Sequence, residues 1–244
     1  ERFVERVWQW KATSGNQSVS QQKQLGESCD WDRLRFTMDE GLSKAVLEVF
    51  VRLYEDKLIY RGERSINWCP RCLTALSDIE VEHEDIRGKL YSIEYALVEN
   101  PDIRLTVATA RPETLLGDTA VAVHPEDERF RHLIGRQLRL PLTTRTIPIV
   151  GDAILVDREF GTGAVKITPA HDFNDYEAGE RHTLARLAIL DHQALLDPAG
   201  MQKAGVETAV IEMLQGLPVA KARSKVEALL RERDILTKVD DHKM

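Results

Sequence analysis

The chain has little cysteine and no long hydrophobic run. Three of its 244 residues are cysteine, which argues against a disulfide framework and favours a reducing compartment. Its longest uninterrupted apolar stretches are a few residues, as at Ile147 to Val150, whereas a helix needs roughly 20 residues to cross a bilayer. We therefore expect no membrane partner and a cytoplasmic location.

Several short motifs that bind nucleotides or activate nucleophiles are also missing from the sequence. It contains no Gly-x-x-x-x-Gly-Lys loop, no Gly-x-Gly-x-x-Gly turn, no His-x-Gly-His run, no Lys-Met-Ser-Lys-Ser run and no nucleophile elbow. The formal charge of -7 argues against a general nucleic-acid coat protein. Two arginine- and lysine-rich stretches, 129–145 and 221–233, fit either a solvated face or a local contact with a phosphate backbone.

Hydrophobic periodicity predicts helices in roughly the first 60 residues. An apolar stripe runs from Phe3 to Trp8, and a second one predicts a helix from about Asp39 to Lys57. Between them, the polar stretch from Thr13 to Gln24 is typical of a loop. Because the chain begins at Glu1 and reads as helix at once, we interpret it as a piece of a longer protein.

The period changes to strict alternation in the middle of the chain, which predicts short strands. The predicted strands contain Tyr91 to Leu97, Ile103 to Val107, Val121 and Val123, Leu138 and Leu140, Ile147 and Ile149, and Ile154 and Val156. Such close spacing favours a barrel or a strongly curved sheet. Helical spacing returns from Val206. The predicted fold class is therefore α/β, a β-barrel-like domain of short strands with flanking helices, divided at 1–77, 78–200 and 201–244.

The stretch from Gly161 to Asp175 carries the most chemistry. Alternation puts Lys166 and Thr168 on one face of a strand that Pro169 ends. Asp172 and Asp175 follow at the start of a predicted helix. A cation, a hydroxyl and two carboxylates at one corner suit a zwitterion or an amino-acid ester.

A structural interpretation of the two carboxylates remains open. Asp172 and Asp175 also fit the N-cap and N3 positions of a helix, where they would satisfy free backbone donors. The two roles are compatible, because the helix dipole keeps such carboxylates ionised, as an ammonium ligand requires.

A second informative stretch runs from Thr106 to Thr119, where a strand meets an Arg111-Pro112 break. Together with Gly161 to Asp175, it resembles the editing domain inserted in class I aminoacyl-tRNA synthetases, and the residues of both stretches are similar to those of the valyl type. Two further stretches, Gly26 to Asp32 and Asn67 to Asp78, share that resemblance. It implies that residues 1–77 link to the synthetase catalytic core, 78–200 form the editing domain and 201–244 return to the core.

The resemblance implies a proofreading hydrolase. A hydrophobic site that binds valine rejects threonine only about 10²-fold, and the synthetase for valine is itself the known example. A second site must therefore remove threonine that has been attached by mistake. The implied reaction is hydrolysis of the ester of threonyl-tRNA(Val), with the tRNA(Val) acceptor end and the rest of the synthetase chain as partners. The parent enzyme would use ATP and Mg²⁺, whereas this piece would need no cofactor and make no adenylate. Alternatives are a silent module that binds the acceptor end or threonine, and an editing domain of isoleucyl or leucyl type.

The resemblance also implies the site residues, among which Asp175 holds the α-ammonium of the substrate. The implied catalytic set is Asp175, Asp172, Lys166 and Thr168, and the implied substrate-binding set is Arg111, Thr114, Phe160, Thr109 and His171. In the absence of an activated nucleophile, we expect direct attack by water. An aspartate with an ordinary pKa of about 3.9 is a poor base at neutral pH, so binding is the expected duty of the two carboxylates.

A histidine and two cysteines suggest catalytic and metal-binding roles, which the sequence supports only in part. His171 could act as a general base, but a histidine at a strand end is more often structural. Cys69 and Cys72 form half of a tetrahedral zinc site. The other half is missing, since Cys29 is distant in sequence and His83 stands alone, so zinc is not expected.

Overall fold

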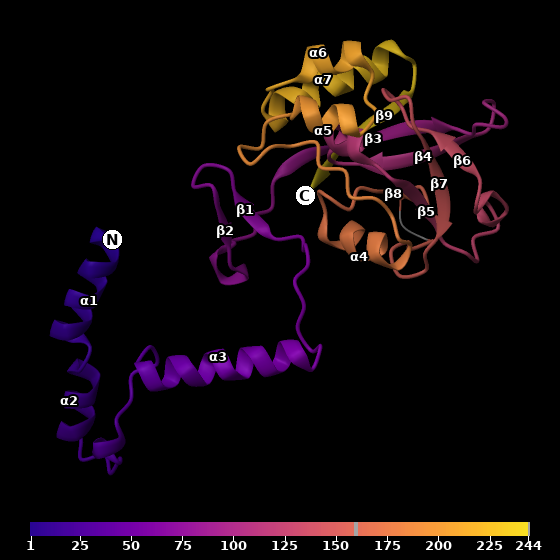
Figure 1. Ribbon diagram of the computed structural model, residues 1–244. Coiled ribbons are helices and arrows are strands. Elements are labelled where there is room, and N and C mark those ends of the chain that lie inside the picture. Colours follow the sequence, from indigo (N-terminus) through magenta and orange to yellow (C-terminus); the bar gives the residue numbers. More distant parts are fainter. Residues whose placement is uncertain (159–160, 244) are drawn as a thin grey trace. The chain divides into compact units, whose positions relative to one another are not determined.

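The computed structural model describes residues 1–158 and 161–243, which form two compact units divided between Glu63 and Arg64 (Figure 1). The first unit contains the helices α1 (Arg2–Ser14), α2 (Gln17–Gln24) and α3 (Glu40–Glu55), and the short 3-10 helix η1 (Trp31–Arg33). The helices expected around Phe3 to Trp8 and from about Asp39 to Lys57 are confirmed. Asp39 begins α3, since its side chain accepts the backbone N–H of Leu42 at 2.8 Å.

The expected loop at 13–24 is wrong for residues 13–14, which end α1, and for residues 17–24, which form α2. This segment is polar but contains neither glycine nor proline, and its glutamine and lysine residues are good helix formers. Among all helices of the described residues, none combines the length and the apolar character that crossing a membrane requires.

Within its described residues, the second unit contains three sheets and four α-helices. A hairpin pairs β1 (Asn67–Cys69) with β2 (Thr74–Leu76). A three-stranded antiparallel sheet has the order β4-β3-β9, with β3 at Arg87–Ala96, β4 at Arg104–Thr109 and β9 at Leu236–Lys243. A four-stranded sheet has the order β6-β7-β5-β8, with β5 at Ala120–Val123, β6 at Gln137–Arg139, β7 at Thr146–Gly151 and β8 at Ala164–Ile167.

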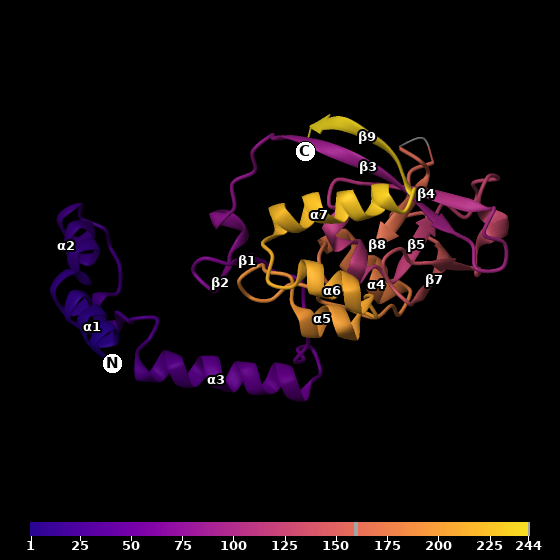
Figure 2. The ribbon, with the colours of Figure 1, turned by 90° about the horizontal axis from the view of Figure 1, so that it is seen from above.

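The α-helices of this unit follow the four-stranded sheet in sequence, whereas its 3-10 helices precede β8. The α-helices are α4 (Phe173–Arg181), α5 (Pro198–Lys203), α6 (Thr208–Leu214) and α7 (Val219–Glu232), and the 3-10 helices are η2 (Asp78–Glu80), η3 (Pro112–Gly117) and η4 (Arg131–Leu133). Helices α5, α6 and α7 group together on one side of the unit, whereas α4 lies apart beside β8 (Figures 1 and 2). The predicted mixture of helices and short strands is confirmed.

Of the two arrangements expected, a barrel or a strongly curved sheet, the strands of the described residues do not form a closed barrel. The three- and four-stranded sheets remain separate ladders, and a bridge between Leu97 and Leu138 joins the end of β3 to β6. Alternation predicts which side chains face a core, but it carries no information on which strand edges pair.

The strand expected at Ile154 and Val156 is also wrong, because residues 153–155 form a turn. The carboxylate of Asp152 causes the turn: its Oδ1 accepts the backbone N–H groups of Ile154 and Leu155, each at 2.9 Å. Its Oδ2 accepts Nη2 of Arg181 at 2.7 Å and so ties the turn to the end of α4.

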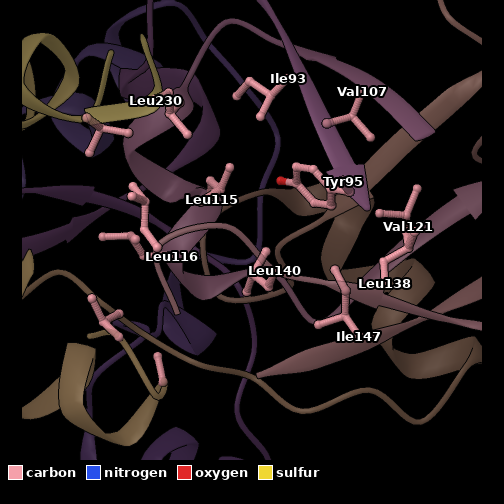
Figure 3. Packing of buried hydrophobic residues seen from close by; sticks show 14 of the residues in the cluster. Ile93, Tyr95, Val107, Leu115, Leu116, Val121, Leu138, Leu140, Ile147 and Leu230 are labelled. Atoms are coloured by element: carbon pink, nitrogen blue, oxygen red, sulfur yellow. The ribbon is translucent and has the colours of Figure 1, made fainter. Parts of the chain in front are cut away.

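The described residues of the second unit bury two hydrophobic clusters, of which the larger runs through the three- and four-stranded sheets and the helices (Figure 3), and the smaller packs β5 and β8 against α4. Ile93 and Val107 enter the larger cluster from the three-stranded sheet, Leu138 from the four-stranded sheet, Leu116 from η3 and Leu230 from α7. The helices after residue 200 therefore share their core with the strands, and β9 adds a hydrogen-bonded edge to β3.

A buried ion pair fastens η3 to α7. The carboxylate of Glu113 is fully buried and accepts Nε and Nη2 of Arg223, each at 2.9 Å. This forked geometry fixes both angle and distance. Arg223 belongs to the basic stretch at 221–233, so at this position the charge serves the fold.

Candidate functional site

A hollow of about 420 Å³ opens where β4, η3, β8 and the start of α4 meet. We call it the Asp175 hollow. Eight of the nine residues expected at the site line it: Thr109, Arg111, Thr114, Lys166, Thr168, His171, Asp172 and Asp175. The ninth, Phe160, lies outside the described residues. Two stretches that are about 50 residues apart in sequence thus meet in one wall.

Lys166 is buried on the wall of the Asp175 hollow, and its ammonium group is fully engaged. Its Nζ donates to Thr114 Oγ1 at 3.0 Å, to Asp118 Oδ1 at 3.1 Å and to Thr168 Oγ1 at 2.5 Å. An ammonium has three protons, so these contacts use all of them. Lys166 therefore offers the hollow a fixed positive charge and has no proton left for a further hydrogen bond.

Asp118 organises this wall, and sequence reasoning missed it. The residue is fully buried, and its Oδ1 accepts the Thr168 hydroxyl at 2.6 Å as well as Lys166. Its Oδ2 accepts the Tyr95 hydroxyl at 2.7 Å. Burial raises the pKa of Asp118, against the opposing effects of Lys166 and the hydroxyl donors. Asp118 lies within the informative stretch from Thr106 to Thr119, and that position was the available signal.

Asp175 joins α4 to the end of β8. Its Oδ2 accepts the backbone N–H of Thr168 at 2.8 Å, and its side chain is mostly buried beside Lys166. Burial raises the pKa of Asp175 to about 6, which the Thr168 N–H and Lys166 partly oppose. The ordinary aspartate pKa assumed from the sequence does not hold here. At neutral pH the carboxylate is still ionised, but little solvent stabilises its charge.

Asp172 is the N-cap of α4, as the structural interpretation expected. Its Oδ1 accepts the backbone N–H of Asn174 at 2.9 Å and that of Asp175 at 3.2 Å. The side chain is exposed at the mouth of the Asp175 hollow. Capping and contact with a ligand are therefore compatible at this residue.

We expect Asp172→Ala to lower the free energy of unfolding by about 1 kcal/mol, because two N–H groups of α4 lose their acceptor. Asp172→Asn keeps an oxygen at the cap and should change stability by a few tenths of a kcal/mol. Urea denaturation of both variants measures the difference. Equal losses in the two variants would show that the negative charge, rather than the cap, stabilises the helix.

His171 has the geometry of a structural histidine. Its Nε2 accepts the backbone N–H of Ile189 at 3.1 Å, and its carbonyl oxygen accepts Nη1 of Arg111 at 2.7 Å. Burial, helped by the nearby charges of Arg111 and Lys166, lowers its pKa to about 4. The ring is therefore neutral at physiological pH, with its Nε2 lone pair already used.

Arg111 stands half-exposed at the rim of the Asp175 hollow and is fixed by its neighbours. Its backbone N–H donates to Thr109 Oγ1 at 3.1 Å, and its carbonyl accepts the Thr114 hydroxyl at 3.0 Å. The guanidinium lies 3.8 Å from the carboxylate of Glu113. These contacts place a directed cation at the entrance.

Cys69 and Cys72 lie at the β1–β2 hairpin, where the Cys72 backbone N–H donates to Cys69 Sγ at 3.3 Å. Within residues 1–158 and 161–243, no group of three or more histidine, cysteine or acidic side chains is arranged to hold a metal ion. The described residues thus supply two of the four ligands that structural zinc takes.

Comparison with known proteins gives one family match and many relatives. The family model described as "tRNA synthetases class I (I, L, M and V)" matches residues 1–231. The valine–tRNA ligase of Geobacter sulfurreducens is 59% identical over 242 residues, which are 99% of this chain and 26% of that protein. That of Streptomyces avermitilis is 56% identical over 229 residues, 94% of this chain and 24% of that protein.

The chain thus spans about a quarter of the length of the curated relatives it matches. A solved structure described as "The crystal structure of GlLeuRS-CP1" superposes with a TM-score of 0.45 at 15% identity, and covers 62% of this chain and 98% of that chain. Because the family model covers nearly the whole sequence, the chain belongs to the class I tRNA synthetases of the isoleucine, leucine, methionine and valine group.

Proposed function

We propose that this chain is the editing part of a valine–tRNA ligase and hydrolyses the ester of threonyl-tRNA(Val). The proposal rests on two charged side chains in the wall of the Asp175 hollow. Asp175 supplies a buried, ionised carboxylate, and Lys166 supplies a positive charge that hydrogen bonds to protein groups hold in place. An aminoacyl ester has an ammonium to meet the carboxylate and a carbonyl oxygen that becomes negative during hydrolysis. The identity of 59% to a valine–tRNA ligase supports the choice of amino acid.

The walls of the Asp175 hollow explain how threonine would be preferred over valine. The largely buried hydroxyl of Thr109 lines it; this oxygen accepts the Arg111 backbone N–H, and its own proton can be donated to a ligand. A threonyl hydroxyl can accept that hydrogen bond, whereas a valyl methyl cannot. Unpaired buried polar groups cost about 1–3 kcal/mol each, which is the size of effect that discrimination requires.

Water is the proposed nucleophile. Thr168 is almost wholly buried and its hydroxyl already donates to Asp118, so it does not reach an ester carbon in the hollow. The oxygen of water would add to the ester carbonyl carbon and lose a proton. The bond between this carbon and the ribose oxygen would then break, and the ribose oxygen would take up a proton. Lys166 would stabilise the developing negative charge through its field, and Asp175 would hold the ammonium in place.

The activity of the whole protein is part of the same proposal. We infer that the parent chain attaches valine to tRNA(Val) with ATP and Mg²⁺, in the cytoplasm, and that residues 1–77 link to its catalytic core. Residues 78–200 would supply the editing site. Residues 201–244 would complete the hydrophobic core of the editing domain and lead the chain back to the catalytic core of the synthetase. The tRNA(Val) acceptor end is the expected partner.

Incubation of the chain with threonyl-tRNA(Val) and with valyl-tRNA(Val) tests the proposal. Release of threonine at least 100-fold faster than valine is expected, and equal or absent release would overturn it. Tight binding of the acceptor end without release would identify a binding module instead. Faster release from isoleucine or norvaline esters would assign another specificity.

We expect the release of threonine to depend on pH. Asp175 must be ionised to hold an ammonium, so kcat/KM should rise with pH through about 6. It should fall again near pH 8, where the substrate amine loses its proton. His171 has a pKa of about 4 and should add no inflection between pH 5 and 8. An acidic limb centred well below 5 would show that the ionisation of Asp175 does not control the reaction.

A further inference from the structure

A group of charged side chains lies behind the rim of the Asp175 hollow. Glu113 belongs to η3, Arg111 directly precedes that helix, and Arg223 comes from α7. The Glu113 side chain is fully buried, whereas 42% of the Arg111 side chain and 29% of the Arg223 side chain are exposed. Two guanidinium groups therefore share one buried carboxylate, and one positive charge of the group is left over.

The distances show which of the two cations neutralises the carboxylate. Arg223 donates from Nε and from Nη2 to the two oxygens of Glu113, each at 2.9 Å. The Nε atom of Arg111 lies 3.8 Å from Glu113 Oε1, which is beyond hydrogen-bond distance. Because Arg223 occupies both oxygens in a fork, the positive charge that is left over belongs to Arg111.

Arg111 presents this charge at the entrance of the Asp175 hollow. Its Nη1 donates to the carbonyl oxygen of His171 at 2.7 Å, which fixes the guanidinium beside the hollow. Among the described residues, this carbonyl takes one of the five N–H donors that a guanidinium has. The other donors suit carbonyl or phosphate oxygens, which an aminoacyl ester and the strand attached to it carry.

Arg223 decides whether Arg111 can keep this position. Without Arg223, the carboxylate of Glu113 would be buried with neither of its two close donors, which is costly for a charged group. The Arg111 guanidinium is already 3.8 Å away, so a small rotation of this side chain would satisfy the carboxylate. The same rotation would withdraw the positive charge from the entrance of the Asp175 hollow.

We propose that Arg223 is a positioning residue of the editing site: it occupies Glu113 and thereby leaves the Arg111 guanidinium at the entrance for the substrate. The proposal rests on the proposed function, in which Arg111 binds the substrate. Helix α7 lies after residues 78–200, the expected editing domain. The proposal therefore gives the segment 201–244 a part in substrate binding as well as in the hydrophobic core.

The kinetics of threonine release from threonyl-tRNA(Val) by the 244-residue chain test the proposal. Arg223→Met should raise KM about tenfold, the effect of one lost charge-assisted hydrogen bond, and change kcat less than about twofold. Arg223→Met/Glu113→Met also removes the buried charge, so Arg111 should return and KM should lie within about threefold of the wild-type value. A purely structural role predicts no such recovery, because the double variant lacks the entire link between η3 and α7.

Two further variants keep the test decisive if Arg223→Met does not fold. Arg223→Lys retains a cation but cannot form the fork, so one oxygen of Glu113 becomes available to Arg111 and KM should rise about threefold. Arg233→Met is the matched control, since Arg233 ends α7 and forms the same kind of fork with Glu207, at 2.7 and 2.6 Å. This control should leave KM unchanged. An unchanged KM in folded Arg223→Met or Arg223→Lys, or a high KM in the double variant, would overturn the proposal.

A crystal structure of Arg223→Lys gives a readout that does not depend on activity. It should show the Arg111 guanidinium within about 3.2 Å of a Glu113 oxygen, and an unmoved Arg111 would contradict the positioning role. If the wild type releases no threonine, the editing proposal fails, and this structure still decides the role of Arg223. A rise of KM with threonyl-tRNA(Val) but not with threonyl-adenosine would assign the Arg111 contact to a phosphate, and a rise with both would assign it to the ester.

Discussion

Asp175→Asn is expected to slow the release of threonine at least 100-fold while the protein remains folded. The amide keeps an oxygen for the Thr168 N–H but loses the charge that would hold an ammonium. Burial of that charge raises the pKa of Asp175 to about 6, so the ionised form opposes folding at neutral pH. The variant should therefore be as stable as the wild type at pH 7.5, or more stable by up to a few kcal/mol. Deacylation kinetics and thermal unfolding measure the two effects.

The pH dependence of stability gives an internal control for Asp175. Its folded pKa lies above the ordinary value of 3.8, so it adds stability as the pH falls from above 6 to below 4. The pKa of His171 is lowered from 6.5 to about 4, so it removes stability over the same range. The two effects oppose each other in the wild type. In Asp175→Asn the contribution of His171 remains, and stability should fall steadily between pH 6.5 and 4.

A different outcome would assign Asp175 to the fold. If Asp175→Asn loses several kcal/mol of stability and the deacylation rate of the folded fraction is unchanged, the carboxylate serves only to join α4 to β8. Asp175→Ala cannot make this distinction, because it removes the Thr168 contact together with the charge.

Lys166→Met is expected to have the largest effect on stability, a loss of about 3–5 kcal/mol. Its side chain is buried, and its removal leaves the fully buried carboxylate of Asp118 without its cation. Threonine release should also disappear, since the positive charge of the Asp175 hollow is gone. Urea denaturation measures the first effect and deacylation the second.

A double-mutant cycle tests whether the loss comes from the stranded charge. Asp118→Asn alone should also destabilise, because Lys166 then lacks its counter-charge. In the Lys166→Met background, however, it should recover part of the stability, and the coupling energy should exceed 1 kcal/mol. Tyr95→Phe is a milder control that removes one hydrogen bond to Asp118 and should cost about 1–2 kcal/mol. Additive losses at Lys166 and Asp118 would contradict the proposed dependence.

Local sequence patterns predicted the strands whose apolar residues alternate and the helix that begins at an N-cap residue. The expected strand at Lys166 and the helix after Asp172 both exist, since alternation and an N-cap are local signals. Ile154 and Val156 alternate as well, yet the side chain of Asp152 accepts the backbone N–H groups of Ile154 and Leu155 and so forms a turn in place of a strand. Such local side-chain bonds compete with strand pairing, and periodicity does not register them.

Long-range relations were beyond the sequence. The strand β9 was not expected, because its polar residues form an edge that exists only through pairing with β3. Asp118 was missed for a similar reason: a single aspartate after glycine reads as a turn until the fold brings Lys166 to it. The resemblance to editing domains supplied the candidate site residues, whereas the hydrogen bonds that consume the protons of Lys166 emerge from the structure.

The pairing of β9 with β3 has a consequence for how this unit can be built into a larger protein. Arg87 at the start of β3 is the register partner of Lys243 at the end of β9. Neighbouring strands lie about 5 Å apart, so residues 87 and 243, the two ends of the segment from β3 to β9, lie at nearly the same point. A segment whose ends adjoin can stand in place of a short surface loop of a host fold and leave the spacing of the host's own elements unchanged.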